Sequence, residues 1–229
     1  MKSATLAQIQ ADRAAKRAVV LATNLATGAE RLIYPNALDG LEPLLAAAVG
    51  NAARNDQSGN VDTPEGKLFL HVFNPPLRLV VVGAVHIAQP LARMAALAGY
   101  DVTIIDPRSA FATNERFPGV TISTEWPDEA LAKLKPDART AVVTLTHDPK
   151  IDDPALEATL RSPAFYVGSL GSRKTHNARL YRLHKAGFTE TETARIHGPV
   201  GLGIGAKSPA EIAVAILAQI TERLRQPKS

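Results

Sequence analysis

The sequence predicts an α/β protein in which a doubly wound, mostly parallel sheet follows a small N-terminal α+β domain. From residue 77 onward, short continuous apolar runs alternate with helical segments, as in parallel strands that helices cover on both faces. Before that point, residues 18–35 have the pattern of two strands around a tight turn. Pro75 and Pro76 cannot donate to a sheet ladder, so the predicted domains are residues 1–76 and 77–229.

The expected elements follow in chain order. In the first domain they are a helix over 6–17, the hairpin, a helix over 41–56, a loop over 57–66 and a strand over 67–73. In the second domain the expected strands are 79–82, 101–105, 119–122, 140–145 and 164–167. The expected helices are 88–98, 128–134, 153–160 and 172–186. A last helix is expected over 209–225, because Ser208, Pro209 and Glu211 form a capping-box pattern.

Composition excludes several classes of function. The 229 residues carry a formal net charge of +4, which favours anionic ligands but is too small to predict nucleic-acid binding. The absence of cysteine excludes disulfides, thiolate metal sites and cysteine nucleophiles. No apolar run approaches the roughly 20 residues of a membrane span, and no secretory signal is recognisable, so we expect a cytoplasmic protein.

The first strand of the second domain ends in a turn of the Rossmann type. Gly83 suits the tight turn, and Ala88 stands where a small residue packs the helix on the strand. Asp106 ends the next strand, where an acid often binds ribose. Val85, however, replaces the glycine that lets the backbone approach a pyrophosphate, so a dinucleotide site is compromised. His86 follows at the start of the helix and could meet an anion or a metal.

Two further side chains follow the fourth strand of this domain. His147 and Asp148 are predicted to lie at the same edge of the sheet as His86 and Asp106, which could make a metal site or an acid–base pair. Alternatively, the aspartates of this segment serve turns and the cap of the next helix, with Pro154 at its first position. We favour that role for residues 152–153 and leave both interpretations open for His147 and Asp148.

Residues 168–174 form a glycine loop between a strand and a helix. Such loops expose backbone N–H groups, and Arg173 and Lys174 add full positive charges. Residues 168–198 contain six basic and two acidic residues, which favours phosphate binding over a merely solvated helix. A second glycine loop precedes the last helix. Nothing in the sequence marks a nucleophile, so we assign no catalytic residue and no metal ligand, and expect binding or delivery.

Four stretches carry a resemblance: VVVGAVHIAQPLARMAALAGYDVTIIDPR, THDPKIDDPAL, YVGSLGSRKTHNARL and RIHGPVGLGIGAKSPAEIAVAIL. Together they resemble the XdhC/CoxI family, accessory proteins of molybdenum hydroxylases such as xanthine and carbon monoxide dehydrogenase. The resemblance implies a Rossmann-like domain and a chaperone that binds molybdenum cofactor, as molybdopterin or its dinucleotide, and inserts it into an apo hydroxylase. A cofactor sulfurase or a second XdhC-like protein is a further implied partner, and a homodimer is possible.

The resemblance and the residues together assign the candidate cofactor-binding side chains. They are Gly83, Ala84, His86, Asp106, Arg108, His147, Gly168, Ser169, Gly171, Ser172, Arg173 and Lys174. The chain departs from the family at Val85 and at Gly203, where many members have glycine and an acid, and it resembles a short CoxI-like form. The alternatives are an NAD(P)-binding oxidoreductase, which Val85 opposes, and an interaction module of the maturation complex that binds no cofactor.

Overall fold

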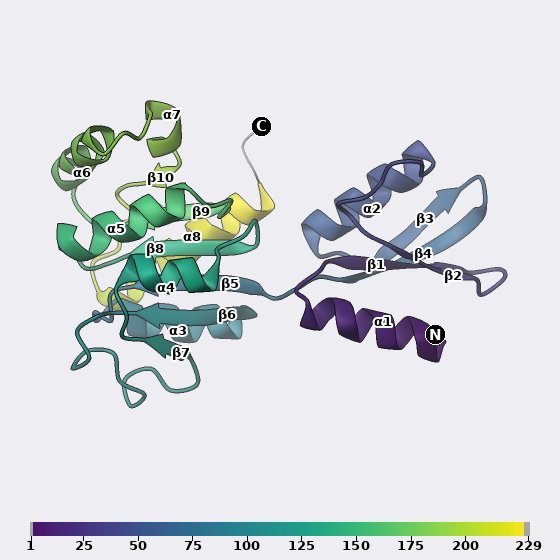
Figure 1. Ribbon diagram of the computed structural model, residues 1–229, viewed down its shortest axis with the longest axis horizontal. Coiled ribbons are helices and arrows are strands. Elements are labelled where there is room, and N and C mark those ends of the chain that lie inside the picture. Colours follow the sequence, from purple (N-terminus) through teal and green to yellow (C-terminus); the bar gives the residue numbers. More distant parts are fainter. Residues whose placement is uncertain (1, 227–229) are drawn as a thin grey trace. The chain divides into compact units, whose positions relative to one another are not determined.

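A computed structural model of the chain describes residues 2–226 (Figure 1). The chain divides into two compact units, Met1–Pro75 and Pro76–Ser229. Each unit has its own sheet and its own apolar core, and we describe each by itself. No helix within residues 2–226 combines the length and apolar character that crossing a bilayer requires.

The first unit is an antiparallel sheet with a helix on each face. It contains α1 (Ser3–Ala14), β1 (Val19–Asn24), β2 (Glu30–Ile33), α2 (Pro43–Asn55), β3 (Gly59–Thr63) and β4 (Gly66–Phe73), with strand order β2-β1-β4-β3. Helix α2 packs on one face through Leu45 and Val49, and α1 packs on the other through Ile9 (Figure 1). Strands β1 and β2 pair antiparallel, which confirms the predicted hairpin.

The predicted loop over 57–66 is wrong, because it contains β3. This strand pairs with β4 in a hairpin whose last pair is Thr63 and Gly66. It lies at the edge of the sheet, where polar side chains such as Asn60 and Asp62 can face water. Its polar composition is the reason that it resembles a loop in the sequence.

The second unit is a six-stranded parallel sheet covered on both faces. It contains β5 (Leu77–Val82), α3 (Ala88–Leu97), β6 (Tyr100–Ile105), β7 (Thr121–Ser123), α4 (Pro127–Leu134), β8 (Thr140–Thr144), α5 (Pro149–Leu160), β9 (Tyr166–Ser169), α6 (Arg173–Lys185), α7 (Glu190–Thr193), β10 (Ile196–His197) and α8 (Pro209–Arg225). The strand order is β10-β9-β8-β5-β6-β7, and every pairing is parallel. The predicted fold class is confirmed; the short elements α7 and β10 were not expected.

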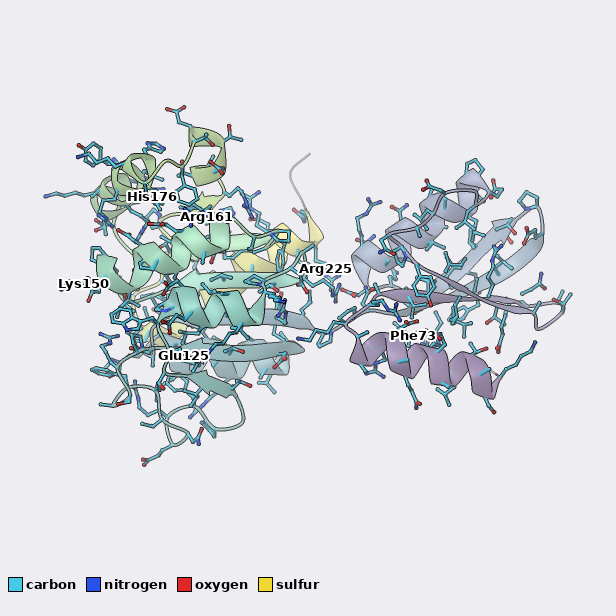
Figure 2. The ribbon with its side chains drawn as sticks, in the orientation of Figure 1. Phe73, Glu125, Lys150, Arg161, His176 and Arg225 are labelled. Carbon is cyan, nitrogen blue, oxygen red and sulfur yellow. The ribbon has the colours of Figure 1, made fainter. Side chains whose placement is uncertain are left out.

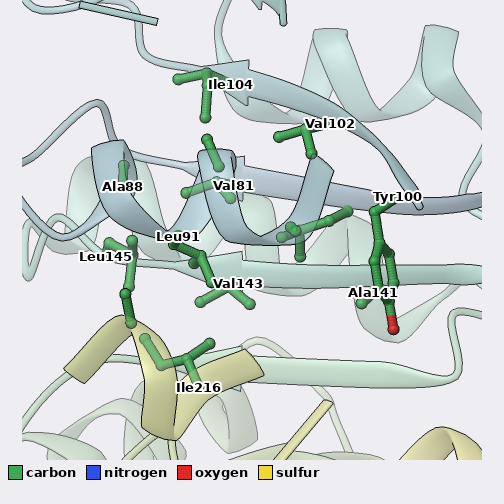
Figure 3. Close-up of a cluster of buried hydrophobic side chains, with 14 of the residues drawn as sticks. Val81, Ala88, Leu91, Tyr100, Val102, Ile104, Ala141, Val143, Leu145 and Ile216 are labelled. Carbon is green, nitrogen blue, oxygen red and sulfur yellow. The ribbon is translucent and has the colours of Figure 1, made fainter. Parts of the chain in front are cut away.

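The core of this unit lies on both sides of β5, whose six residues are all buried. Leu79 and Val81 face α3 and α8, where Leu91 and Ile216 complete one apolar layer (Figure 3). The alternate residues of β5 face α4 and α5 in a second layer. Burying each such side chain contributes about 1.5–3 kcal/mol to the free energy of folding. The well-packed sheet therefore holds the loops at its edges in place.

Helix α5 begins four residues earlier than the sequence predicts. Asp148 is its N-cap, with a carboxylate oxygen that accepts from the Lys150 N–H at 3.0 Å, and Pro149 occupies the first turn. Pro154 therefore lies inside the helix and not at its first position. The earlier start brings Asp152 into the first turn, where it is buried.

Candidate functional site

The pairing register brings the ends of four strands to one edge of the parallel sheet. Val82, the last residue of β5, pairs with Ile105 of β6 and Thr144 of β8, and Thr144 pairs with Ser169 of β9. The strand order reverses between β5 and β8, and ligands of doubly wound sheets bind in the crevice outside such a reversal. The segments that follow β5, β6 and β8 surround this crevice.

Gly83 lets the turn after β5 lie against the turn after β8. Its φ is +110°, and a Cβ at this position would lie 2.6 Å from Thr146 Cγ2 and 3.3 Å from the Thr146 backbone nitrogen. Its N–H donates to the carbonyl oxygen of Ile105 at 2.8 Å. The glycine is therefore required by this close approach of two turns, whatever ligand the crevice takes.

The start of α3 offers free backbone donors. Its N-cap, Ile87, makes no side-chain hydrogen bond to the helix. Within residues 2–226, the N–H groups of Val85 and His86 donate to no protein acceptor. The His86 side chain is exposed, and Val85 is half-buried against the core. Free N–H groups at the start of a helix favour anions.

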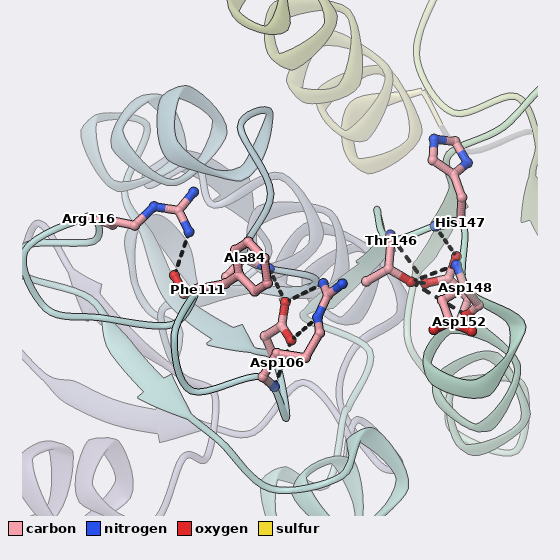
Figure 4. Close-up of polar contacts among 9 residues, drawn as sticks. Ala84, Asp106, Phe111, Arg116, Thr146, His147, Asp148 and Asp152 are labelled. Atoms are coloured by element: carbon pink, nitrogen blue, oxygen red, sulfur yellow. Dashed lines mark hydrogen bonds and ion pairs between the residues drawn. The ribbon is translucent and has the colours of Figure 1, made fainter.

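Asp106 lies where it was predicted, but its carboxylate is fully engaged (Figure 4). One oxygen accepts from the Ala84 N–H and from Arg108 Nη2, both at 2.8 Å. The other accepts from the backbone N–H and the Nε of Arg108, at 3.0 and 2.9 Å. Burial raises the pKa of Asp106, but these hydrogen bonds outweigh it and hold the pKa below its ordinary value. The acid joins Ala84 to Arg108 and has no oxygen left unpaired for a ribose.

The turn after β8 is held by a second buried carboxylate. Asp152 is 2% exposed and accepts from Thr146 Oγ1 at 2.7 Å and from the His147 N–H at 3.1 Å (Figure 4). Burial raises the pKa of Asp152. His147 is exposed, with a φ of +62°. Within the described part of the chain, no group of three or more His, Asp or Glu side chains lies close enough to hold a metal ion.

The predicted glycine loop divides into a buried and an exposed part. Gly168 and Ser169 end β9: a Cβ at Gly168 would lie 2.6 Å from Val200 Cγ2, and Ser169 Oγ is hydrogen-bonded to Thr144 Oγ1 at 2.5 Å. Their roles are packing and sheet pairing.

The exposed part of the loop starts α6. Ser172 caps this helix by accepting from the Thr175 N–H at 3.1 Å, and Gly171 precedes it with a φ of +147°. Arg173 and Lys174 are exposed in the first turn and have no ion-pair partner within residues 2–226. These two cations are therefore available to a ligand.

Three of the six basic residues counted as phosphate-binding in the sequence are structural. Arg182 pairs with Asp153 at 2.5 Å. Arg195 donates to the carbonyl of Leu160, the last residue of α5, at 2.7 Å, and to two carbonyls of the segment that follows. Arg179 is 1% exposed and donates to the Leu170 carbonyl at 2.8 Å. Charge counting could not show that these guanidinium groups already have acceptors.

Arg179 holds the glycine loop through its hydrogen bond to the Leu170 carbonyl. Its Nη1 lies 3.4 Å from Nδ1 of His176, which Figure 2 labels on α6, and its buried Nε has no hydrogen-bond partner. Burial lowers the pKa of Arg179, while the charges of Asp152 and Asp153 oppose that shift. This side chain therefore links the loop before α6 electrostatically to the carboxylate that holds the turn after β8.

The sequence interpretation missed a cavity beside the first turn. The cavity of about 530 Å³ is lined by Val85, His86, Gln89, Arg108, Phe111 and Arg116, and we call it the Phe111 cavity. Its aromatic ring and both of its arginines come from the irregular segment between β6 and β7. The only trace in the sequence is an aromatic residue between two arginines, which carries no period that would place it.

The second unit of the chain is similar in sequence to known proteins. A family model described as the XdhC Rossmann domain matches residues 79–220. The molybdenum cofactor insertion chaperone PaoD of Escherichia coli (strain K12) is 36% identical over 155 residues, which are 67% of this chain and 42% of PaoD. A Bacillus subtilis (strain 168) protein, named as a probable xanthine dehydrogenase subunit, is 31% identical over 156 residues, 68% of this chain and 45% of that protein.

A solved structure from Bacillus halodurans, described as a xanthine dehydrogenase, superposes with a TM-score of 0.71. It covers 99% of this chain and 65% of the other, at 23% identity, and so supports the fold alone. The chain spans less than half the length of the two curated relatives above, at 42% and 45%.

Proposed function

We propose that this chain, which belongs to the XdhC Rossmann-domain family, acts as a carrier of molybdenum cofactor. It binds the cofactor as cargo and delivers it to an apo molybdenum hydroxylase. The observation that carries the proposal is the likeness to PaoD, a protein named as a cofactor insertion chaperone, over two thirds of this chain, 67%. The hydroxylase would be of the xanthine or carbon monoxide dehydrogenase type.

The crevice supports binding rather than catalysis, because each of its three carboxylates already has a structural role. Asp106 holds Arg108, Asp148 caps α5 and Asp152 holds the turn after β8. A carboxyl group that acts as a general acid or base must be free to exchange a proton with the substrate, and these three are engaged within the protein. The exposed cations at the start of α6 and the free N–H groups before α3 instead suit the phosphate of a pterin cofactor.

The same geometry opposes the alternative of an NAD(P)-dependent oxidoreductase. The acid that would hold the ribose of NAD, Asp106, has both oxygens engaged. Val85 places a branched side chain where a dinucleotide site has glycine. Calorimetric titration with NAD⁺ should give no micromolar binding, and a micromolar affinity would favour the oxidoreductase instead.

Further partners are proposed beside the hydroxylase. With no cysteine, the chain cannot hold cofactor sulfur on a thiol, so a cofactor sulfurase or a second XdhC-like protein would supply that step. A homodimer is an alternative to the second homologue. Co-purification with an apo hydroxylase and sedimentation of the free protein distinguish these assemblies.

The test is anaerobic titration of the full chain with molybdenum cofactor, followed by absorbance and co-elution on a sizing column. We expect stoichiometric co-elution, lost when Arg173 and Lys174 are both changed to Glu. The matched control changes Arg13 and Lys16 to Glu at the end of α1 in the first unit, two exposed cations with no ion-pair partner within residues 2–226, with the same change of charge. Folded protein that never co-elutes with cofactor would contradict the proposal. Equal loss in the control would indicate a general charge effect.

A further inference from the structure

The Phe111 cavity contains an aromatic ring that the protein core does not use. Phe111 is 46% exposed. Its backbone carbonyl accepts from Arg116 Nη1 at 2.6 Å, so the segment that carries the ring is fixed by a hydrogen bond (Figure 4). The cavity of about 530 Å³ lies within the range of small-molecule sites, about 300–1,000 Å³.

Two guanidinium groups lie near this ring. Arg108 Cζ lies 4.8 Å from the ring centroid and Arg116 Cζ 5.9 Å from it. Aromatic rings and guanidinium planes are the surfaces on which proteins stack nucleobases. The cavity therefore has the chemistry to hold a planar heterocycle.

The charges in the cavity point to an anion on the same ligand. The charge of Arg108 is matched by the buried Asp106. Arg116 forms no ion pair within residues 2–226, and its guanidinium contacts a backbone carbonyl and two aromatic rings. Val85 and His86, whose N–H groups donate to no protein acceptor within residues 2–226, line the same cavity. A phosphate would neutralise Arg116 and accept from these donors.

We propose that the Phe111 cavity binds a nucleoside monophosphate unit, with its base on Phe111 and its phosphate at Arg116. This inference rests on the proposed function: the unit is the part by which a dinucleotide form of the cargo differs from the monophosphate form. The cavity thus selects the dinucleotide form. The ribose contributes little, because Asp106 has no oxygen left unpaired for its hydroxyl groups.

The test titrates the full chain calorimetrically with cytidine, guanosine and adenosine monophosphates, and with the matching nucleosides and ribose 5-phosphate. At least one mononucleotide should bind with a Kd below about 1 mM. The nucleoside and ribose 5-phosphate should each bind at least about tenfold more weakly, because each lacks one of the two contacts. With cofactor, the dinucleotide form should co-elute more strongly than the monophosphate form.

Variants locate the site. Phe111→Ala should weaken mononucleotide binding about tenfold or more, and Arg116→Gln should weaken the mononucleotide but not the nucleoside. Phe111→Leu, which keeps an apolar side chain, checks that the loss does not come from a misplaced segment. The matched control is Tyr181→Ala, an exposed ring on α6 with the Lys185 ammonium 4.6 Å from its centroid, which should change nothing.

The outcomes separate the two proposals. If no mononucleotide binds but cofactor still co-elutes, the nucleotide site is wrong and the chaperone function stands. If mononucleotides bind equally well to the Phe111→Ala and Arg116→Gln variants, the site is also wrong. If mononucleotides bind as expected but neither form of the cofactor co-elutes, the nucleotide site stands and the chaperone function is wrong.

Discussion

At the scale of single residues, Gly83 is subject to two constraints that can be measured separately. Its φ of +110° is unfavourable for any other residue, and a Cβ would lie 2.6 Å from Thr146 Cγ2. Gly83→Ala should therefore lower the free energy of unfolding by about 3 kcal/mol, from backbone strain plus overpacking. Gly99→Ala is the control, because Gly99 has a φ of +87° and nothing within 4 Å. It should cost about 1 kcal/mol in urea unfolding, and equal losses would mean that the approach to Thr146 costs nothing.

Asp106 makes a pH-dependent contribution to stability. Burial raises the pKa of Asp106, but the hydrogen bonds from Arg108 and Ala84 leave it lower than in the unfolded chain. The folded state thus binds this proton more weakly, so the stabilisation is present above the ordinary pKa of about 3.9 and is lost as pH falls through the lower folded value. Asp106→Asn should cost about 2 kcal/mol at pH 7, and the difference from the wild type should shrink below about pH 4. The exposed Asp101→Asn is the control, and a pH-independent difference would contradict this account.

At the scale of the elements, helix α6 carries two kinds of cation. Arg179 is buried and stabilises the fold, whereas Arg173 and Lys174 are exposed to solvent. Arg179 donates to the Leu170 carbonyl and opposes the charge of Asp152. Arg179→Met should lower the free energy of unfolding by about 3 kcal/mol, because it leaves the Leu170 carbonyl and the buried Asp152 carboxylate without their cation. Arg173→Met should cost less than about 0.5 kcal/mol, yet weaken cofactor co-elution. Urea unfolding of both variants checks this, and similar losses would contradict it.

The elements that could be predicted from the sequence are those with an unambiguous local signal. The capping box at Ser208 placed α8 correctly, because its hydrogen bonds lie within four residues of each other. The start of α5 could not be placed, because Asp148-Pro149 and Asp153-Pro154 carry the same cap signal. The choice between them is made by the packing of the helix on the sheet, which no local pattern contains.

At the scale of the whole molecule, the sequence predicted which strand ends meet, because parallel strands share one carboxyl edge. It did not predict the Phe111 cavity, since Phe111 and Arg116 lie in an irregular segment whose path depends on contacts with α3, such as the Gln89 side chain on the Arg116 carbonyl. It also counted Arg179 and Arg195 as ligand-binding, because a charge count does not show which carbonyls a guanidinium reaches. Edges of a sheet are thus predictable from order along the chain, whereas cavities depend on tertiary packing.

The division of the chain is open to a direct test, because the second unit has its own core. Its apolar layers are built from residues between Leu77 and Ile220, and the units meet in the sequence at Pro75 and Pro76. A fragment of residues 76–229 should therefore unfold cooperatively, with helical circular dichroism retained. It should also co-elute with molybdenum cofactor, as we expect of the full chain, because every candidate site residue lies within it. A folded fragment that binds no cofactor, beside a full chain that does, would assign part of the site to residues 1–75. A fragment that fails to fold would contradict the predicted boundary.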